Sequence, residues 1–189
     1  MREGYFNIVL TTNFDDLVRD AMAIYLSESP VVCAADSEVA TITITSDRPK
    51  IVKLHGDYLF ELLKNTRQEL EQLDPNMEAK FKEFARDCGL IVIGYGGRDH
   101  SVMRVIEELL KDERMFPLGV YWGVRAEADG SYALSKRVQD LATNFGNRFQ
   151  LCDCACHQRL RFRMRLFQRA HRLRALPEFR EVLLVRDVV

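Results

Sequence analysis

Three short polar segments hold the side chains of this sequence that are best suited to chemistry. They read TTNFDD at residues 11–16, HGD at residues 55–57 and GYGGRD at residues 94–99. The amide of Asn13 could orient water or a substrate without itself titrating, and the imidazole of His55 could exchange a proton near neutral pH. Brought together, these groups would support acid–base chemistry on a bound ligand.

Each polar segment directly follows a short apolar run that predicts a β-strand. The three expected strands cover residues 5–10, 51–54 and 90–93. In a doubly wound sheet the carboxyl ends of parallel strands lie along one edge, and ligands bind outside that edge. The sequence therefore predicts that three distant polar segments converge on one crevice.

Further apolar runs and helical patterns define the fold class. We expect additional strands at residues 118–124 and 148–152, and helices at residues 15–26, 78–88, 100–111 and 132–143. Residues 60–73 fit another helix or a lid, and the β-branched residues 31–45 fit an edge strand or a short hairpin. This alternation predicts an α/β fold of three layers, in which helices cover both faces of a mainly parallel sheet.

A purely structural interpretation exists for each polar segment. Asn13 could be a helix N-cap, with Asp15 and Asp16 placed favourably near the positive end of the helix dipole. His55 could be a turn residue whose ring bonds a carbonyl group, and residues 94–97 could form only a tight turn capped by Asp99. Taken one at a time, these interpretations are the simpler ones. The occurrence of all three segments at successive strand ends favours a site.

Composition excludes several classes of protein. The chain has 189 residues, of which 47% are hydrophobic and 29% charged, as is typical of one ordinary globular domain. Its net charge of −1 gives no general attraction to nucleic acid or to anionic membranes. The sequence has no apolar run as long as a membrane span, no signal peptide, and five cysteines that do not form a secretory disulfide framework. We therefore expect a cytoplasmic protein.

The polar segments also carry a family resemblance. TTNFDDL, KLHGD and LIVIGYGGRDHSVM, in this order and followed by LGVYWGV, resemble the sirtuin-like NAD-consuming domains, especially the prokaryotic branch linked to antiphage defence. The resemblance covers about residues 7–124 and extends less clearly toward residue 153. It implies a bacterial protein with a Rossmann-like fold, for which NAD is the substrate and ADP-ribose a product.

Carried over to this chain, the resemblance assigns roles to individual residues. Asn13 would orient the ribose and the attacking water, and His55 would act as a base toward a ribose hydroxyl. Thr12 and Asp15 would line the nicotinamide-ribose pocket. The adenosine side would be held by Gly94, Tyr95, Gly96 and Asp99. Together these residues form the predicted NAD site.

Two features of the sirtuin-like family are missing from their expected positions. The family begins with a strand and a glycine-rich loop whose amides meet the pyrophosphate, whereas this sequence starts almost directly at the strand before Asn13. We therefore expect an N-terminally truncated domain, completed by a homo-oligomer or by a partner chain that supplies the loop. Deacylating sirtuins also carry paired zinc-binding cysteines after the histidine, but only Cys88 lies between His55 and Gly94. The sequence predicts no metal and no protein deacylase.

The sequence ends in an arginine-rich segment of different composition. Residues 159–166 alternate arginine with apolar residues, which fits a strand, but Leu160, Met164 and Phe167 also fit helical spacing. We expect residues 1–153 to form the domain and residues 154–189 to form a helical tail that packs on it. The arginines could contact phosphates, although a solvated or interface-pairing face is the simpler interpretation. A shifted reading frame would also explain the composition.

The sequence CDCACH at residues 152–157 raises the question of zinc. Three cysteines at alternate positions beside a histidine do not have the spacing of structural zinc sites, and the sequence offers no second pair of ligands. We expect partly buried thiols at a strand end instead.

Three function classes remain open. The first is an NAD glycohydrolase of the antiphage type, and the second is a catalytically inactive nucleotide-binding or scaffolding protein of the same fold. A nucleic-acid-binding module that uses the arginine tail is a third and weaker alternative. Asn13 and His55 favour the first class, and the missing glycine-rich loop favours the second. We expect the first.

Overall fold

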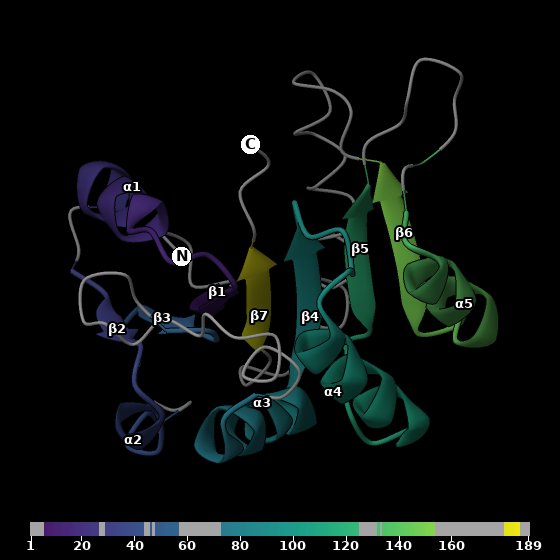
Figure 1. The fold of residues 1–189 in the computed structure, drawn as a ribbon, viewed down its shortest axis with the longest axis horizontal. Coiled ribbons are helices and arrows are strands. Elements are labelled where there is room, and N and C mark those ends of the chain that lie inside the picture. The colour runs from purple at the N-terminus through teal and green to yellow at the C-terminus, as the bar shows by residue number, and fades with distance from the viewer. Residues whose placement is uncertain are drawn as a thin grey trace, which may run out of the picture.

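One parallel sheet runs through the molecule. A computed structural model of the chain describes residues 6–26, 29–43, 46, 48–56, 73–124, 132, 134–153 and 180–185. Its strands form one sheet, and the neighbouring strands are paired in parallel. Figure 1 shows the strands as a row of arrows with helices packed against them. The predicted α/β class and the mainly parallel sheet are confirmed.

Strands and helices alternate along most of the chain. The strands are β1 (Phe6–Thr11), β2 (Val31–Cys33), β3 (Lys50–Lys53), β4 (Cys88–Ile93), β5 (Val120–Val124), β6 (Phe149–Asp153) and β7 (Arg180–Val185). The helices are α1 (Leu17–Leu26), α2 (Asp36–Val39), α3 (Pro75–Asp87), α4 (His100–Lys111) and α5 (Lys136–Asn144). Within the sheet the strands follow the order β2-β3-β1-β7-β4-β5-β6.

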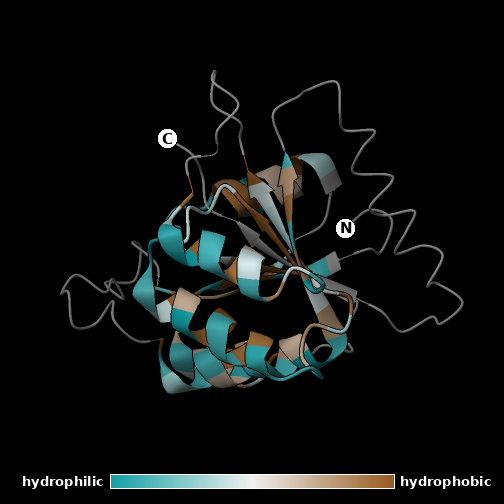
Figure 2. Cartoon of the chain, turned by 90° about the vertical axis from the view of Figure 1, so that its right-hand side faces the viewer, coloured by the Kyte–Doolittle hydropathy of each residue, from teal (hydrophilic) through white to brown (hydrophobic). Residues whose placement is uncertain are grey.

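Alternate strand residues pack on opposite faces of the sheet. Ile8 and Leu10 of β1 belong to the main core, which also takes buried residues from α2, α3, α4 and α5. Val9 lies between them in sequence and instead packs with Met22 of α1 and Ile51 of β3. Because successive side chains of a strand point to opposite faces, α1 covers one face and the other helices cover the opposite face. These are the three layers of a Rossmann-like fold, and in Figure 2 apolar strands lie behind helices whose outer surfaces are largely hydrophilic.

Capping residues determine where the helices begin. The carboxylate of Asp99 accepts a hydrogen bond from the N–H of Ser101 in the first turn of α4, at 3.0 Å. The hydroxyl of Ser135 accepts one from the N–H of Val138 in α5, and Pro75 occupies the first position of α3. Such residues satisfy or avoid the N–H groups that a helix start leaves without intrahelical partners. These residues therefore define where the preceding loops end and the helices begin.

Most predicted elements occur at or near their predicted positions, and the helix at residues 100–111 has the predicted bounds. Residues 31–45 contain the edge strand β2 and then α2, so the hairpin alternative is wrong. The reason is Glu38, whose carboxylate accepts hydrogen bonds from the N–H groups of Ala34 and Ala35 and so turns the chain into a helix. The helix or lid predicted at residues 60–73 lies outside the described residues, except for residue 73.

The C-terminal part of the chain contributes a strand to the centre of the sheet. Strand β7 lies between β1 and β4, where Leu183 pairs with Val9 on one side and with Ile91 on the other. The prediction of a helical tail is therefore wrong for Arg180–Val185, and the domain includes these residues. The run VLLV at residues 182–185 is apolar and contains two β-branched valines, as suits a central parallel strand. Residues 154–179, with most of the arginines, lie outside the described part of the chain.

Candidate functional site

The junctions that follow β1, β3 and β4 meet at one edge of the sheet. Thr11 of β1 pairs with Lys53 of β3. Asn13 follows Thr11 by two residues and His55 follows Lys53 by two residues, so both lie just beyond the ends of neighbouring strands. Strands β1 and β7 separate β3 from β4. The loops after β3 and β4 nevertheless touch, because His55 contacts Asp99 across the ends of the two strands between them. This is the edge of an α/β sheet at which ligands bind.

His55 and Asp99 form a buried imidazole–carboxylate pair. Nε2 of His55 faces Oδ2 of Asp99, and the two side chains are 4% and 15% exposed. Oδ1 of Asp99 accepts hydrogen bonds from the N–H of Ser101 at 3.0 Å and from its hydroxyl at 2.8 Å. Burial opposes ionisation of Asp99, but the hydrogen bonds from His55 and Ser101 outweigh it and lower the pKa of the carboxyl group.

Two buried polar atoms at this edge have no hydrogen-bond partner within the described part of the chain. They are Nδ1 of His55 and Oγ1 of Thr12, whose residues are 4% and 8% exposed. A buried polar atom without a partner costs free energy, and each such atom needs an explanation. Hydroxyl and amide groups of a ligand are the kinds of partner that each atom could bond.

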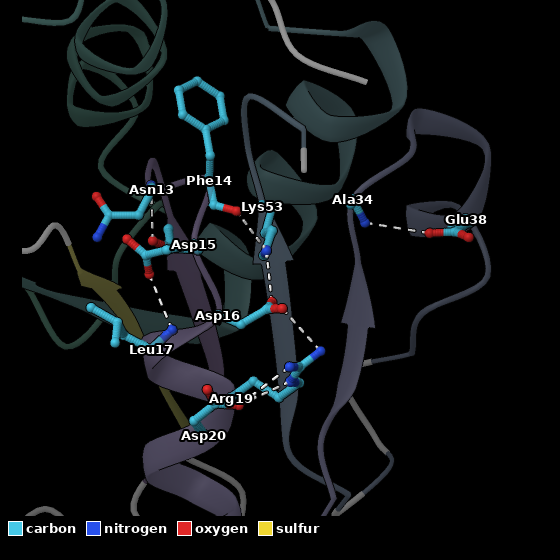
Figure 3. Close-up of polar contacts among 11 residues, drawn as sticks. Asn13, Phe14, Asp15, Asp16, Leu17, Arg19, Asp20, Ala34, Glu38 and Lys53 are labelled. Atoms are coloured by element: carbon cyan, nitrogen blue, oxygen red, sulfur yellow. Dashed lines mark hydrogen bonds and ion pairs between the residues drawn. The ribbon is translucent and has the colours of Figure 1, made fainter. Parts of the chain in front are cut away.

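The loop after β1 presents Asn13 ahead of the helix. The N–H of Asn13 donates to the hydroxyl of Thr11 at 3.1 Å, and the N–H of Leu17, the first residue of α1, donates to Asp15 at 3.1 Å (Figure 3). Asn13 stands four positions before Leu17, whereas an N-cap immediately precedes the first helical residue. The capping interpretation of Asn13 is therefore wrong, and Asp15 serves the helix start.

A buried ion pair fixes this loop to β3. Nζ of Lys53 donates to Oδ1 of Asp16 at 2.8 Å and to the carbonyl oxygen of Phe14 at 2.9 Å. The side chains of Lys53 and Asp16 are 2% and 7% exposed, and Arg19 forms a second ion pair with Asp16 at 3.0 Å. Figure 3 shows Lys53 reaching from β3 to the loop that carries Asn13. The pair thus holds the residues that follow Asn13 in one conformation.

Contacts from β5 and from the start of α5 hold the glycine-rich loop after β4. The carbonyl oxygen of Tyr95 accepts a hydrogen bond from Nε1 of Trp122 at 3.1 Å, and that of Gly97 accepts one from the hydroxyl of Ser135 at 3.0 Å. Gly94 and Gly97 have positive φ angles of 71° and 67°, which glycine adopts without strain. The loop is therefore attached to both β5 and the start of α5.

Gly96 and Gly97 differ in the space around them, which gives a paired test. A Cβ atom on Gly97 would lie 2.3 Å from Cγ2 of Val138, whereas one on Gly96 would meet nothing closer than Arg98 at 3.9 Å. We expect Gly97→Ala to lower the free energy of unfolding by about 2–3 kcal/mol, through the positive φ angle and overpacking. Gly96→Ala should leave the unfolding midpoint in urea close to that of the wild type. Equal midpoints for the two variants would contradict the packing described for Gly97.

Comparison with known families identifies the domain. The family model described as SIR2-like domain matches residues 7–145. The chain belongs to the SIR2-like domain family. The match begins in β1 and ends just after α5, so it includes Asn13, His55 and Asp99. No curated protein matches the chain. The sirtuin-like resemblance is confirmed, whereas the antiphage branch stays a prediction.

The predicted site residues of this SIR2-like domain fall into three groups. The first group lies in the loop after β1 and consists of Thr12, Asn13 and Asp15. Strand β1 is the neighbour of β3, which leads to His55. Asp99 contacts His55, and Gly94 and Gly96 lie in the loop between Asp99 and β4. Tyr95 is different, because its ring is 2% exposed and packs on Trp122 with the ring centres 5.7 Å apart. Tyr95 therefore supports the loop from the core, and its carbonyl oxygen is already bonded by Trp122.

Sequence reasoning missed the residues that support the SIR2-like site. Lys53, Asp16 and Ser101 are all buried and each fixes a predicted site residue or its loop. A signal for the first pair existed in the sequence IVKLHG, because a lysine inside an apolar strand needs a buried partner of opposite charge. Ser101 carried no such signal, since a serine in the first turn of a helix is common.

The described part of the SIR2-like chain bears on the questions of metal binding and membrane insertion. Within it, no group of three or more His, Cys, Asp or Glu residues could hold a metal ion. No helix there is both long and apolar enough to cross a membrane. Cys154, Cys156 and His157 of the CDCACH segment lie outside the described residues, whereas Cys152 is partly exposed in β6.

Proposed function

We propose that this SIR2-like domain binds NAD at the carboxyl edge of its sheet and hydrolyses it to nicotinamide and ADP-ribose. The bond between nicotinamide and the ribose C1 atom breaks, nicotinamide leaves with the bonding electron pair, and water adds to C1 and releases a proton. Cleavage of this kind builds positive charge on the sugar, so positioned polar groups accelerate it. We further propose a role in bacterial antiphage defence, as in the branch that the motifs resemble.

The observation that carries this proposal is the pair of unsatisfied buried atoms beside Asn13. The hydroxyl of Thr12 and Nδ1 of His55 come from neighbouring strand ends and lack partners among the described residues. A ribose presents several hydroxyl groups, and a nicotinamide presents an amide, so NAD offers donors and acceptors for both atoms. Asn13 lies next to Thr12 in the same loop, where its amide could orient the attacking water.

The glycine-rich loop and the start of α4 complete the proposed site. A Cβ atom on Gly96 would meet only the side chain of Arg98, at 3.9 Å, so the main chain there is not crowded by the core, which suits the approach of a ligand. We propose that the adenosine part of NAD lies along this loop. A second copy of the chain or a partner chain would supply further main-chain donors to the pyrophosphate.

Replacing Thr12 with valine tests the proposal. Valine has nearly the shape of threonine but lacks the unsatisfied hydroxyl, so the melting temperature should not fall. The affinity for NAD should drop by about 2–10-fold, which corresponds to one lost hydrogen bond of about 0.5–1.5 kcal/mol. Both quantities can be measured by thermal shift and titration calorimetry, together with nicotinamide release by the wild type.

Thr41→Val is the matched control, because the Thr41 hydroxyl is exposed and bonds the carbonyl oxygen of Glu38 away from the site. It should leave NAD affinity unchanged. If the wild type neither binds NAD nor releases nicotinamide, the proposal is wrong. Binding without release would favour the alternative of a catalytically inactive nucleotide-binding protein.

A further inference from the structure

We propose that Asp99 is a positioning residue that keeps the proton of the neutral His55 ring on Nε2, so that Nδ1 is the atom that accepts a proton from the ligand. The position of the ring proton is a property of the protein without a ligand. The role of Nδ1 as a base in turnover rests on the proposed NAD hydrolysis. The evidence is the arrangement of hydrogen bonds around the two side chains.

The first step concerns the carboxylate of Asp99. Oδ1 already accepts two hydrogen bonds, from the N–H and the hydroxyl of Ser101, which is fully buried. Oδ2 is therefore the oxygen that faces His55, and the helix start of α4 prevents the carboxylate from rotating without losing its two bonds. An ionised carboxylate can only accept hydrogen bonds. The contact with Oδ2 consequently requires a proton on Nε2 of His55.

The second step concerns the other ring nitrogen. In a neutral imidazole with a proton on Nε2, Nδ1 carries the lone pair and acts as an acceptor. Nδ1 of His55 is buried and has no donor among the residues that the structure describes. Its lone pair is thus not used by any described residue, and a general base requires such a free lone pair.

The third step concerns where the pair lies. His55 follows β3 and Asp99 precedes α4, so their contact spans the ends of β1 and β7, beside the loop that carries Asn13. Arg137 interacts electrostatically with Asp99. Its guanidinium group, however, donates two hydrogen bonds to the carboxylate of Glu107, at 2.7 and 2.9 Å, whereas Oδ2 of Asp99 contacts His55. The pair of His55 and Asp99 therefore lies at the same strand ends as the proposed ribose position.

Asp99→Asn separates the cap function of Asp99 from its effect on the histidine. Asparagine is about as good an N-cap as aspartate, so its oxygen should keep the two bonds from Ser101. Its NH2 group then faces Nε2 of His55 and needs an acceptor there, which moves the ring proton to Nδ1. The melting temperature should change little, while kcat for nicotinamide release should fall by about 10²-fold with little change in KM.

The direct measurement is nitrogen NMR of the His55 ring in the full chain without NAD, at mildly alkaline pH. We expect the wild type to show a protonated Nε2 and Asp99→Asn to show a protonated Nδ1. Ser101→Ala is the control, because it removes one bond to Oδ1 but keeps the carboxylate, and it should retain the wild-type tautomer.

These results distinguish the inference from the proposed function. A wild-type ring with the proton on Nδ1, or on both nitrogens, would overturn the positioning role of Asp99. An Asp99→Asn variant with the wild-type tautomer would overturn it as well. A protonated Nε2 in a protein that does not hydrolyse NAD would support the positioning role and refute the hydrolase.

Discussion

Asn13→Asp should leave a folded protein that no longer releases nicotinamide. The change removes the amide donor and places a negative charge beside the proposed ribose, where misplacement of a single group can cost about 10²-fold in rate. His55→Ala removes the proposed base and should lower turnover by about 10²–10⁴-fold. Nicotinamide release and melting temperature should be compared in a preparation that is first shown to hydrolyse NAD.

Asn144→Asp is the matched control for the Asn13 variant, since it makes the same chemical change at the exposed end of α5. Its turnover should equal that of the wild type. Because Asp15 rather than Asn13 serves the start of α1, a loss of activity in Asn13→Asp cannot come from a lost helix cap. Full activity in Asn13→Asp or in His55→Ala would end the assignment of that residue to the chemistry.

Asp16→Ala should destabilise the fold strongly. The substitution leaves the ammonium group of Lys53, which is 2% exposed, without its carboxylate partner. Removal of one partner from a buried ion pair typically costs about 3–5 kcal/mol, because the remaining charge has lost its water as well as its counterion. Equilibrium unfolding in urea should therefore show a much lower midpoint for this variant.

A double variant separates the charge effect from packing. Asp16→Leu combined with Lys53→Met removes both charges and should recover most of the stability, since apolar replacement of a whole buried pair is often nearly neutral. Asp20→Ala breaks the exposed pair with Arg19 and should change the midpoint little. If Asp16→Ala were as mild as Asp20→Ala, the pair would not be buried as described.

Residue patterns predicted much of this fold because they follow directly from burial. Apolar runs such as residues 90–93 and 118–124 fill both faces of the sheet, so they read as strands without knowledge of their neighbours. Helix α4 was predicted with its observed bounds, since Asp99 caps its start and its buried residues recur with helical spacing. Strand β7 was not predicted, because its partners β1 and β4 are distant in sequence and the arginine-rich context favoured a helix.

The candidate site was predicted in outline but not in its connections. Asn13 and His55 were predicted as site residues because polar segments follow the apolar strands. Parallel strands bring their carboxyl ends to one edge of the sheet. The contact between His55 and Asp99 depends on the strand order, which a single sequence does not reveal. The buried place of Tyr95 likewise depends on Trp122, a residue of another strand.

Strand β7 joins two groups of strands that are each continuous in the chain. Strands β2, β3 and β1 come from residues 6–53, and β4, β5 and β6 come from residues 88–153. During translation, both groups leave the ribosome before residues 180–185, so each exposes an unpaired apolar edge until β7 arrives. His55 belongs to the first group and Asp99 to the second. A nascent chain would therefore hold the two halves of the proposed ligand site apart, and the site could form only after β7 has emerged.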